Sequence, residues 1–178
     1  MVEIRQLTAA EGRQYVPALA GVLLDCVAGG ASVSFMASLT VAEAESFFEH
    51  SVREVERGRR ILLAAFDGSQ LVGTVQVVAA GAPNQPHRAD VAKLLVHRSA
   101  RGRGVGQSLM EAVEQAARAT AKTLLVLDTV TGDSAERLYQ RLGWTRLGVI
   151  PNYALYPDGR LCATTVFYKE LPESEPRP

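Results

Sequence analysis

Three glycines at alternate positions, Gly102, Gly104 and Gly106, separate a strand pattern from a helix pattern. The apolar run that ends at Val96 is typical of a strand, and apolar residues then recur at helical spacing over about 105–120. Glycine tolerates the left-handed backbone of a tight bend, and the free amides at a helix N-terminus attract anions. The segment therefore predicts a strand-to-helix bend that binds a phosphate or pyrophosphate group.

The glycine spacing is compatible with more than one kind of loop. Taken alone, three glycines also suit an ordinary tight turn with surface arginines, and that alternative stays open at this point. A Walker A loop is excluded because no Gly-Lys-Ser/Thr sequence ends the segment, and the G-x-G-x-G spacing matches the dinucleotide fingerprint poorly. Arg98, Arg101 and Arg103 have no acidic neighbour along the sequence, which favours a small anion as the ligand.

The remaining patterns predict one α/β (α+β) domain, residues 1–171, with a mixed central sheet flanked by helices. A crossover around the third helix is expected to follow a mostly antiparallel first half. The end of the chain, 172–178, is rich in Pro and Glu and predicts a flexible tail. The expected strands are 2–7, 60–66, 71–80, 89–97, 124–127, 144–149 and 164–169, and the expected helices are 11–27, 40–58, 105–120 and 133–142.

The charge balance excludes some partners. Nineteen basic residues match nineteen acidic ones, so net charge supports neither nucleic-acid binding nor an anionic membrane surface. No segment is long and apolar enough to span a bilayer and no signal-type N-terminus is present, so we expect a cytoplasmic protein.

Cys26 and Cys162 match no metal spacing, and no metal is expected. The oligomeric state stays open between monomer and homodimer.

Two motifs resemble the GCN5-related N-acetyltransferase (GNAT) family. Arg101–Gly106 resembles its signature R/Q-x-x-G-x-G/A, and Ala135–Trp144 resembles its stretch A-x-x-L-Y-x-x-L-G-F. The resemblance covers nearly the whole chain and implies a splayed sheet, with acetyl-CoA as co-substrate. Loop amides would hold its pyrophosphate, and its pantetheine arm would pair with the preceding strand. The cofactor-binding residues so implied are Leu94, Leu95, Val96, Arg101, Gly102, Arg103, Gly104, Val105, Gly106 and Gln107.

The resemblance also implies catalytic residues. Tyr139 stands at the family's tyrosine position and is expected to act as an acid toward the departing thiolate, although a merely packed aromatic is the alternative. Asp90 and Asp128 are expected near the acceptor amine. Each either takes up the amine proton or only attracts the ammonium while water carries the proton away. A loop-closing role is a further alternative for Asp128. Gly132 departs from the family pattern, because many relatives carry Asn there.

Three further segments, 29–36, 88–94 and 156–161, resemble the tabtoxin-resistance acetyltransferases within the family. This resemblance implies a small amine as acceptor, such as an amino-acid-like toxin or antibiotic of the tabtoxinine-β-lactam type, acetylated directly in a ternary complex. Two alternatives remain: a non-catalytic sensor that binds acetyl-CoA, and an acetyltransferase that acts on a protein amine.

Overall fold

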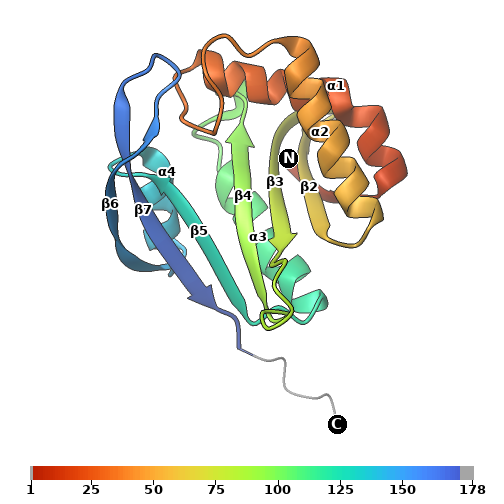
Figure 1. Cartoon of the computed structure of the whole chain (residues 1–178). Coiled ribbons are helices and arrows are strands. Elements are labelled where there is room, and N and C mark those ends of the chain that lie inside the picture. Colours follow the sequence, from red (N-terminus) through yellow and green to blue (C-terminus); the bar gives the residue numbers. More distant parts are fainter. Residues whose placement is uncertain (1, 173–178) are drawn as a thin grey trace.

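The computed structural model describes residues 2–172 and contains one seven-stranded sheet in the order β1-β2-β3-β4-β5-β7-β6. Only β4 and β5 pair in parallel, and all other neighbours are antiparallel. Helices cover both faces, with α1 and α2 in front of the sheet and α3 and α4 behind it in Figure 1. The elements are β1 (Val2–Leu7), α1 (Ala9–Ala28), α2 (Val41–Glu56), β2 (Arg60–Asp67), β3 (Gln70–Ala79), β4 (Arg88–Val96), a 3₁₀ turn (Arg98–Ala100), α3 (Val105–Ala119), β5 (Leu124–Val130), α4 (Ser134–Arg141), β6 (Thr145–Leu155) and β7 (Leu161–Glu170).

The predicted mixed sheet flanked by helices is confirmed, including the crossover through α3. Several boundaries differ from the prediction by a few residues, including the start of β7 and the ends of β5 and β6. β5 continues to Val130 instead of ending at Leu127, so the loop-closing interpretation of Asp128 is wrong. β6 extends to Leu155, beyond the predicted end at 149. Its pairing with β7 shifts register between Ile150 and Ala154, and this irregularity interrupts the alternation on which the prediction depended. Of the predicted tail, Pro172 alone is described, and 173–178 lies outside the described residues.

Local capping fixes where the first two helices begin. Thr40 caps α2: its hydroxyl accepts from the Glu43 amide, and the Glu43 carboxylate accepts from the Thr40 amide at 2.8 Å. Thr8 and Glu11 form the same capping box at α1. Each box satisfies two amides that a helix start otherwise leaves without a partner.

The sheet separates two apolar clusters. On the α1–α2 side, α1 and α2 pack over β2, β3 and the end of β4, and on the other side α3 and α4 pack over β2, β3, β4, β5 and β7. The largest buried side chains of the first cluster include Leu19, Leu23, Phe48 and Leu62, and those of the second include Leu109, Met110, Leu125 and Phe167. α1 and α2 therefore stop short of β5, β6 and β7 on their own side of the sheet.

The pairing of β4 with β5 is short. Residues 88–90 pair with 124–126, whereas β4 runs on to Val96 and β5 to Val130. Figure 1 shows the two strands diverging beyond this point. The central sheet is thus open along the C-terminal halves of its two parallel strands, which is where open α/β sheets usually bind ligands.

The burial of Leu109 leads to a prediction about the stability of the fold. Leu109 is fully buried between α3 and the sheet, and we expect Leu109→Ala to lower the free energy of unfolding by about 2–5 kcal/mol because it leaves a cavity. Leu147 on β6 is 72% exposed, and Leu147→Ala is the matched control, with an expected change within about 0.5 kcal/mol. Urea unfolding followed by circular dichroism measures both. Equal losses for the two variants would contradict the assignment of Leu109 to the core.

Candidate active site

The main-chain amides of residues 102–107 form the most distinctive polar feature of the open edge. Within the described chain, none of these amides donates a hydrogen bond to a main-chain or side-chain acceptor; the first engaged amide is that of Ser108, which donates to the Gly104 carbonyl at 3.1 Å. Gly104 is the N-cap of α3 and provides no side-chain cap. Successive free amides at the positive end of a helix are suited to bind a pyrophosphate.

Each of the three positions favours glycine, but not for the same structural reason. Gly102 and Gly104 lie in the left-handed region, with φ of 72° and 79°, where other residues are strained. A Cβ added to either would meet no atom within 4 Å, so these positions leave the space above the bend open. Gly106 instead lies within α3, and a Cβ there would come 3.3 Å from Leu138 Cδ2 of α4. It permits the close contact of two helices.

The arginines of the bend are held by other parts of the chain. Arg103 pairs with Asp67 at the end of β2 at 2.8 Å, and the Arg98 side chain pairs with Asp25 of α1 at 2.8 Å. Arg101 Nε donates to the Val96 carbonyl at 3.0 Å. The arginines of the bend have no acidic neighbour along the sequence, but in the folded structure Asp25 and Asp67 lie beside two of them, so the expectation of unpaired arginines is wrong. These contacts brace the bend, and the free amides remain its clearest anion-binding groups.

The edge of β4 that faces β5 is the second part of the site. The His97 amide donates to the Val72 carbonyl of β3 at 2.9 Å, so by the alternation of a strand Leu95 also faces β3, whereas Leu94 and Val96 turn their main-chain groups toward β5. β5 does not pair with them. The Leu94 main-chain groups are therefore positioned to pair with an extended ligand, while the Val96 carbonyl already accepts from Arg101.

Tyr139 reaches the same region from α4. Its ring is 5% exposed and packs against Trp144 and Phe167, with ring centroids 6.0 and 5.8 Å away. Burial, and then the nearby charges of Asp128 and Asp133, raise the pKa of the phenol above its ordinary value. Tyr139 therefore stays protonated at neutral pH and can donate a hydrogen bond. The packed-aromatic alternative and the chemical role are compatible, because packing fixes the ring.

The two predicted carboxylates lie on the face of the sheet opposite Tyr139. Leu125 and Leu127 of β5 pack toward α3 and α4, so Asp128 projects to the α1–α2 side, where it is exposed and accepts from Thr164 Oγ1 at 2.8 Å. Asp90 pairs with Val126, which puts it on the same side. Asp90 is ion-paired with Arg88 at 2.5 Å and lies where β4 and β5 are still joined. Asp128, by contrast, lies beyond the last paired residues, where β4 and β5 have separated.

The departure at Gly132 has a local explanation. Its φ of 84° favours glycine, and its amide donates to the carboxylate of Glu136 in the first turn of α4. That hydrogen bond, together with Arg146 and Thr165, holds the pKa of Glu136 below its usual range against the effect of burial. The hydrogen bond between Gly132 and Glu136 thus stabilises the start of α4, the helix that carries Tyr139.

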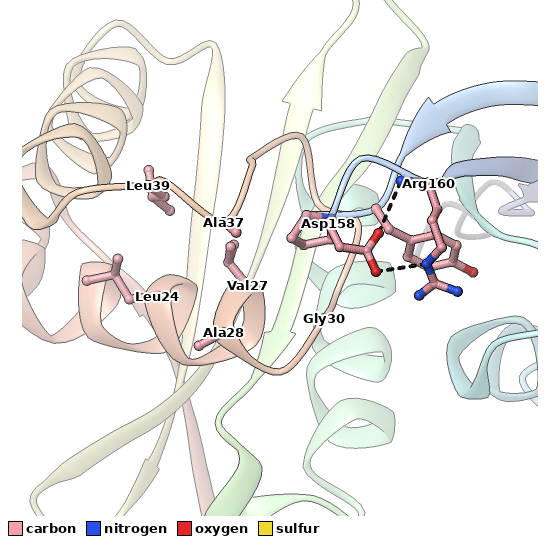
Figure 2. Close-up of a pocket in the computed structure, with 10 residues that line it drawn as sticks. Leu24, Val27, Ala28, Gly30, Ala37, Leu39, Asp158 and Arg160 are labelled. Carbon is pink, nitrogen blue, oxygen red and sulfur yellow. Dashed lines mark hydrogen bonds and ion pairs between the residues drawn. The ribbon is translucent and has the colours of Figure 1, made fainter.

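The loop between α1 and α2 covers one end of the α1–α2 face. Ser32 Oγ donates to the Leu155 carbonyl at 2.7 Å, and the Ala37 amide donates to the Pro157 carbonyl at 3.1 Å, so the loop is fastened to the β6–β7 turn. A cavity of about 380 Å³ lies at this junction (Figure 2). Leu24 and Val27 of α1 border it on one side, and the ion pair of Asp158 with Arg160 borders it on the other. None of the three predicted catalytic residues lines this cavity.

Sequence reasoning missed Lys93. It is the one lysine in β4, and its side chain emerges beside the α1–α2 loop, where the Nζ atom donates to Ser34 Oγ at 3.0 Å. A single charged residue in the otherwise apolar run Val91–Val96 was the signal that could have identified it. Its backbone φ of 56°, which redirects the side chain, is visible only in the structure.

Known proteins resemble this chain in both sequence and fold. The model of the family described as acetyltransferase (GNAT) family matches residues 31–144, well over half of the chain. A solved putative phosphinothricin N-acetyltransferase is similar at 18% identity, with 97% of this chain and 100% of that chain covered and a TM-score of 0.81. YncA, a putative acetyltransferase from Salmonella typhimurium solved with its cofactor acetyl-CoA, is 18% identical over 98% of this chain and 96% of its own, with a TM-score of 0.79. RimL, a ribosomal L7/L12 α-N-protein acetyltransferase solved with coenzyme A, is 17% identical over 96% and 94%, with a TM-score of 0.78.

The fold and the open edge define an α/β protein with a ligand-binding opening between two parallel strands, and the family match is more specific. The chain belongs to the acetyltransferase (GNAT) family. It is accordingly an acetyltransferase that uses acetyl-CoA as acetyl donor, and the free amides of residues 102–107 suit the pyrophosphate of that donor. Over residues 2–172, none of the helices is both long and apolar enough to cross a membrane.

The bend makes a binding prediction. An alanine at position 104 would have to keep a φ of 79°, at a cost of roughly 1–2 kcal/mol, so the bend relaxes and its amides lose their alignment. We expect Gly104→Ala to weaken coenzyme A binding by about tenfold in isothermal titration calorimetry.

The control is Gly21→Ala, in the interior of α1, where an added Cβ meets no atom within 4 Å. This variant is expected to bind coenzyme A like the parent protein and to gain about 0.5–1 kcal/mol in stability. If Gly104→Ala folds and binds coenzyme A as tightly as Gly21→Ala, the bend is not the pyrophosphate site.

Proposed function

We propose that the protein transfers the acetyl group of acetyl-CoA directly to the amine of a small molecule, in a ternary complex at the open edge between β4 and β5. The observation that carries the proposal is the position of Tyr139 and Asp128 on opposite faces of β5, close enough that the charge of Asp128 raises the pKa of Tyr139. A thioester laid along β4 would have a hydrogen-bond donor on one side and a carboxylate, with the acceptor amine, on the other.

The bend and β4 have the binding roles in this proposal. The amides of Gly102–Gln107 bind the pyrophosphate, braced by Arg101 and Arg103, and the exposed edge of Leu94–Val96 pairs with the pantetheine arm. A main-chain amide on this edge is also suited to polarise the thioester carbonyl as an oxyanion hole does. Leu95 contributes through packing, because its side chain is buried under α1 and its main chain faces β3.

In the reaction a C–N bond forms, the C–S bond breaks, and the amine loses a proton. Asp128 attracts the acceptor ammonium and accepts that proton, directly or through water. Tyr139 donates a hydrogen bond to the developing thiolate. An ordinary tyrosine, with a pKa of about 10, is already a weaker acid than an ordinary thiol, with a pKa of about 8.5, and burial raises the pKa of Tyr139 further. Stabilisation of the thiolate through the hydrogen bond is therefore favoured over complete proton transfer. Water returns a proton to the released thiolate.

A small acceptor is favoured over a protein because the α1–α2 loop is fastened to the β6–β7 turn and contacts Lys93 beside the opening, on the face of the sheet that carries Asp128. The name of one similar structure, putative phosphinothricin N-acetyltransferase, and the resemblance to tabtoxin-resistance enzymes both agree with an amino-acid-like acceptor and a role in resistance to such a toxin or antibiotic.

The function is tested by release of free thiol from acetyl-CoA with a panel of small amines headed by amino-acid-like β-lactams. We expect Tyr139→Phe to lower kcat roughly tenfold to a hundredfold, because the thiolate loses its donor while the ring still packs. Tyr15→Phe is the control, because Tyr15 packs on Phe66 in the apolar cluster on the opposite face of the sheet from Tyr139, and it should retain parental kcat. Binding of acetyl-CoA without thiol release from any small amine would overturn the proposal, and acetylation of a protein N-terminus alone would redirect it.

A matched pair of substitutions distinguishes the roles of Asp90 and Asp128. We expect Asp128→Asn to lower kcat/KM for the acceptor by roughly tenfold or more, because it removes the charge that borders the open edge. Asp90→Asn should have a smaller effect, since Arg88 already neutralises Asp90. The affinity for acetyl-CoA, measured by calorimetry, should stay the same in both. A larger loss in Asp90→Asn would assign the leading role to Asp90 instead.

A further inference from the structure

Lys93 has an unusual backbone for a residue inside a strand. Its φ of 56° lies in the left-handed region, which residues other than glycine rarely adopt, and it coincides with an irregularity in the pairing of β3 with β4 between Thr74 and Gln76. A bulge of this kind redirects a side chain and is frequent next to active sites. Here it turns the lysine toward the α1–α2 loop.

The surroundings of the Lys93 ammonium are polar and aromatic. Its Nζ donates to Ser34 Oγ at 3.0 Å and lies 5.8 Å from the ring centre of Phe35 and 5.7 Å from that of Phe47. Within residues 2–172, no carboxylate lies within 4.0 Å of it. Burial lowers the pKa of the ammonium, and the negative charge of Asp128 partly offsets this effect. An ammonium has three donors, and Ser34 uses one of them.

A second cation adds to the positive charge on this face. Arg60 of β2 is half-buried, and its Nη1 atom donates to Ser51 Oγ at 3.1 Å and to the side-chain oxygen of Gln76. Over the described residues it forms no ion pair, and its charge lowers the pKa of Lys93. Two partly buried cations without an anionic contact carry a desolvation cost that an anionic ligand would offset.

Asp128 provides a negative charge across the opening from Lys93. It lies in β5, on the same face of the sheet as Lys93, and is near enough to influence the pKa of the lysine, yet the two residues do not form a salt bridge. The site therefore presents a cation on β4 and a carboxylate on β5 without joining them. A molecule that carries both an amine and an acidic group complements this arrangement, with its amine directed to Asp128 and its acidic group to Lys93.

We propose that Lys93 binds an anionic group of the acceptor, a carboxylate or a similar oxyanion, and so makes the enzyme select amino-acid-like acceptors over simple amines. This inference rests on the proposed function and adds a specificity-determining residue to it. The charge of Arg60 adds to that of Lys93 and so favours an anionic group bound between them and the opening. Ser34, on the α1–α2 loop, orients the ammonium through its hydrogen bond.

The test compares matched acceptors. A panel of α-amino acids, each paired with its carboxamide, is assayed for thiol release from acetyl-CoA with the parent protein. The acid should exceed its amide in kcat/KM by roughly tenfold or more, the effect of one charge-assisted hydrogen bond. In Lys93→Met, which keeps the length of the apolar stem, the ratio of acid to amide should fall to about one through a higher KM for the acid. Lys93→Arg should retain part of the preference because it retains the charge.

Lys122→Met is the matched control. This lysine donates to the Pro86 carbonyl, in the loop before β4, and its loss should leave the ratio of acid to amide as in the parent protein. Equal use of acid and amide by the parent protein, or an equal loss for both acceptors in Lys93→Met, would overturn the role of Lys93 and leave the transferase function in place. If no member of the panel releases thiol, the proposed function itself fails, and this inference fails with it.

Discussion

The candidate active site depends on the early end of the pairing between β4 and β5. A parallel pair inside a sheet normally satisfies its main-chain groups along its whole length, but here pairing stops after Asp90 and Val126. The edge of β4 beyond this point then needs another partner. The same divergence lets α4 bring Tyr139 to one face of β5 while Asp128 stays open on the other. Each proposed step of acetyl transfer uses this opening.

Two sets of contacts fix the segments around the opening. The bend after β4 is braced by ion pairs that reach to Asp25 of α1 and Asp67 of β2, so its free amides are held by distant parts of the chain. The α1–α2 loop is fastened to the β6–β7 turn through Ser32 and Ala37. The amides are thus preorganised, which spares a ligand the cost of ordering them.

The electrostatic arrangement across the opening follows from the same geometry. Lys93 and Arg60 lie on the β2–β4 side, and Asp128 lies on the β5 side, without an ion pair between the two groups. Since β4 and β5 have separated there, their charges are kept apart and stay available to a ligand. A fully paired sheet would bring β4 and β5 to the ordinary interstrand spacing, where opposite charges on one face pair directly.

The sequence by itself determined the order of the elements, the bend and the family. Periodicity and capping are local properties, so Thr40 with Glu43 marked the start of α2, and the glycine spacing with the Leu-Tyr motif around Tyr139 marked both GNAT segments. Only the tertiary structure decided what depends on contacts between distant segments. It pairs Arg98 with Asp25 and Arg103 with Asp67, and it pairs Arg88 with Asp90 while Asp128 borders the opening. It also places the bulge that turns Lys93 toward Ser34. Charge pairing and burial act through space, and adjacency along the chain does not reveal which side chains the sheet brings together.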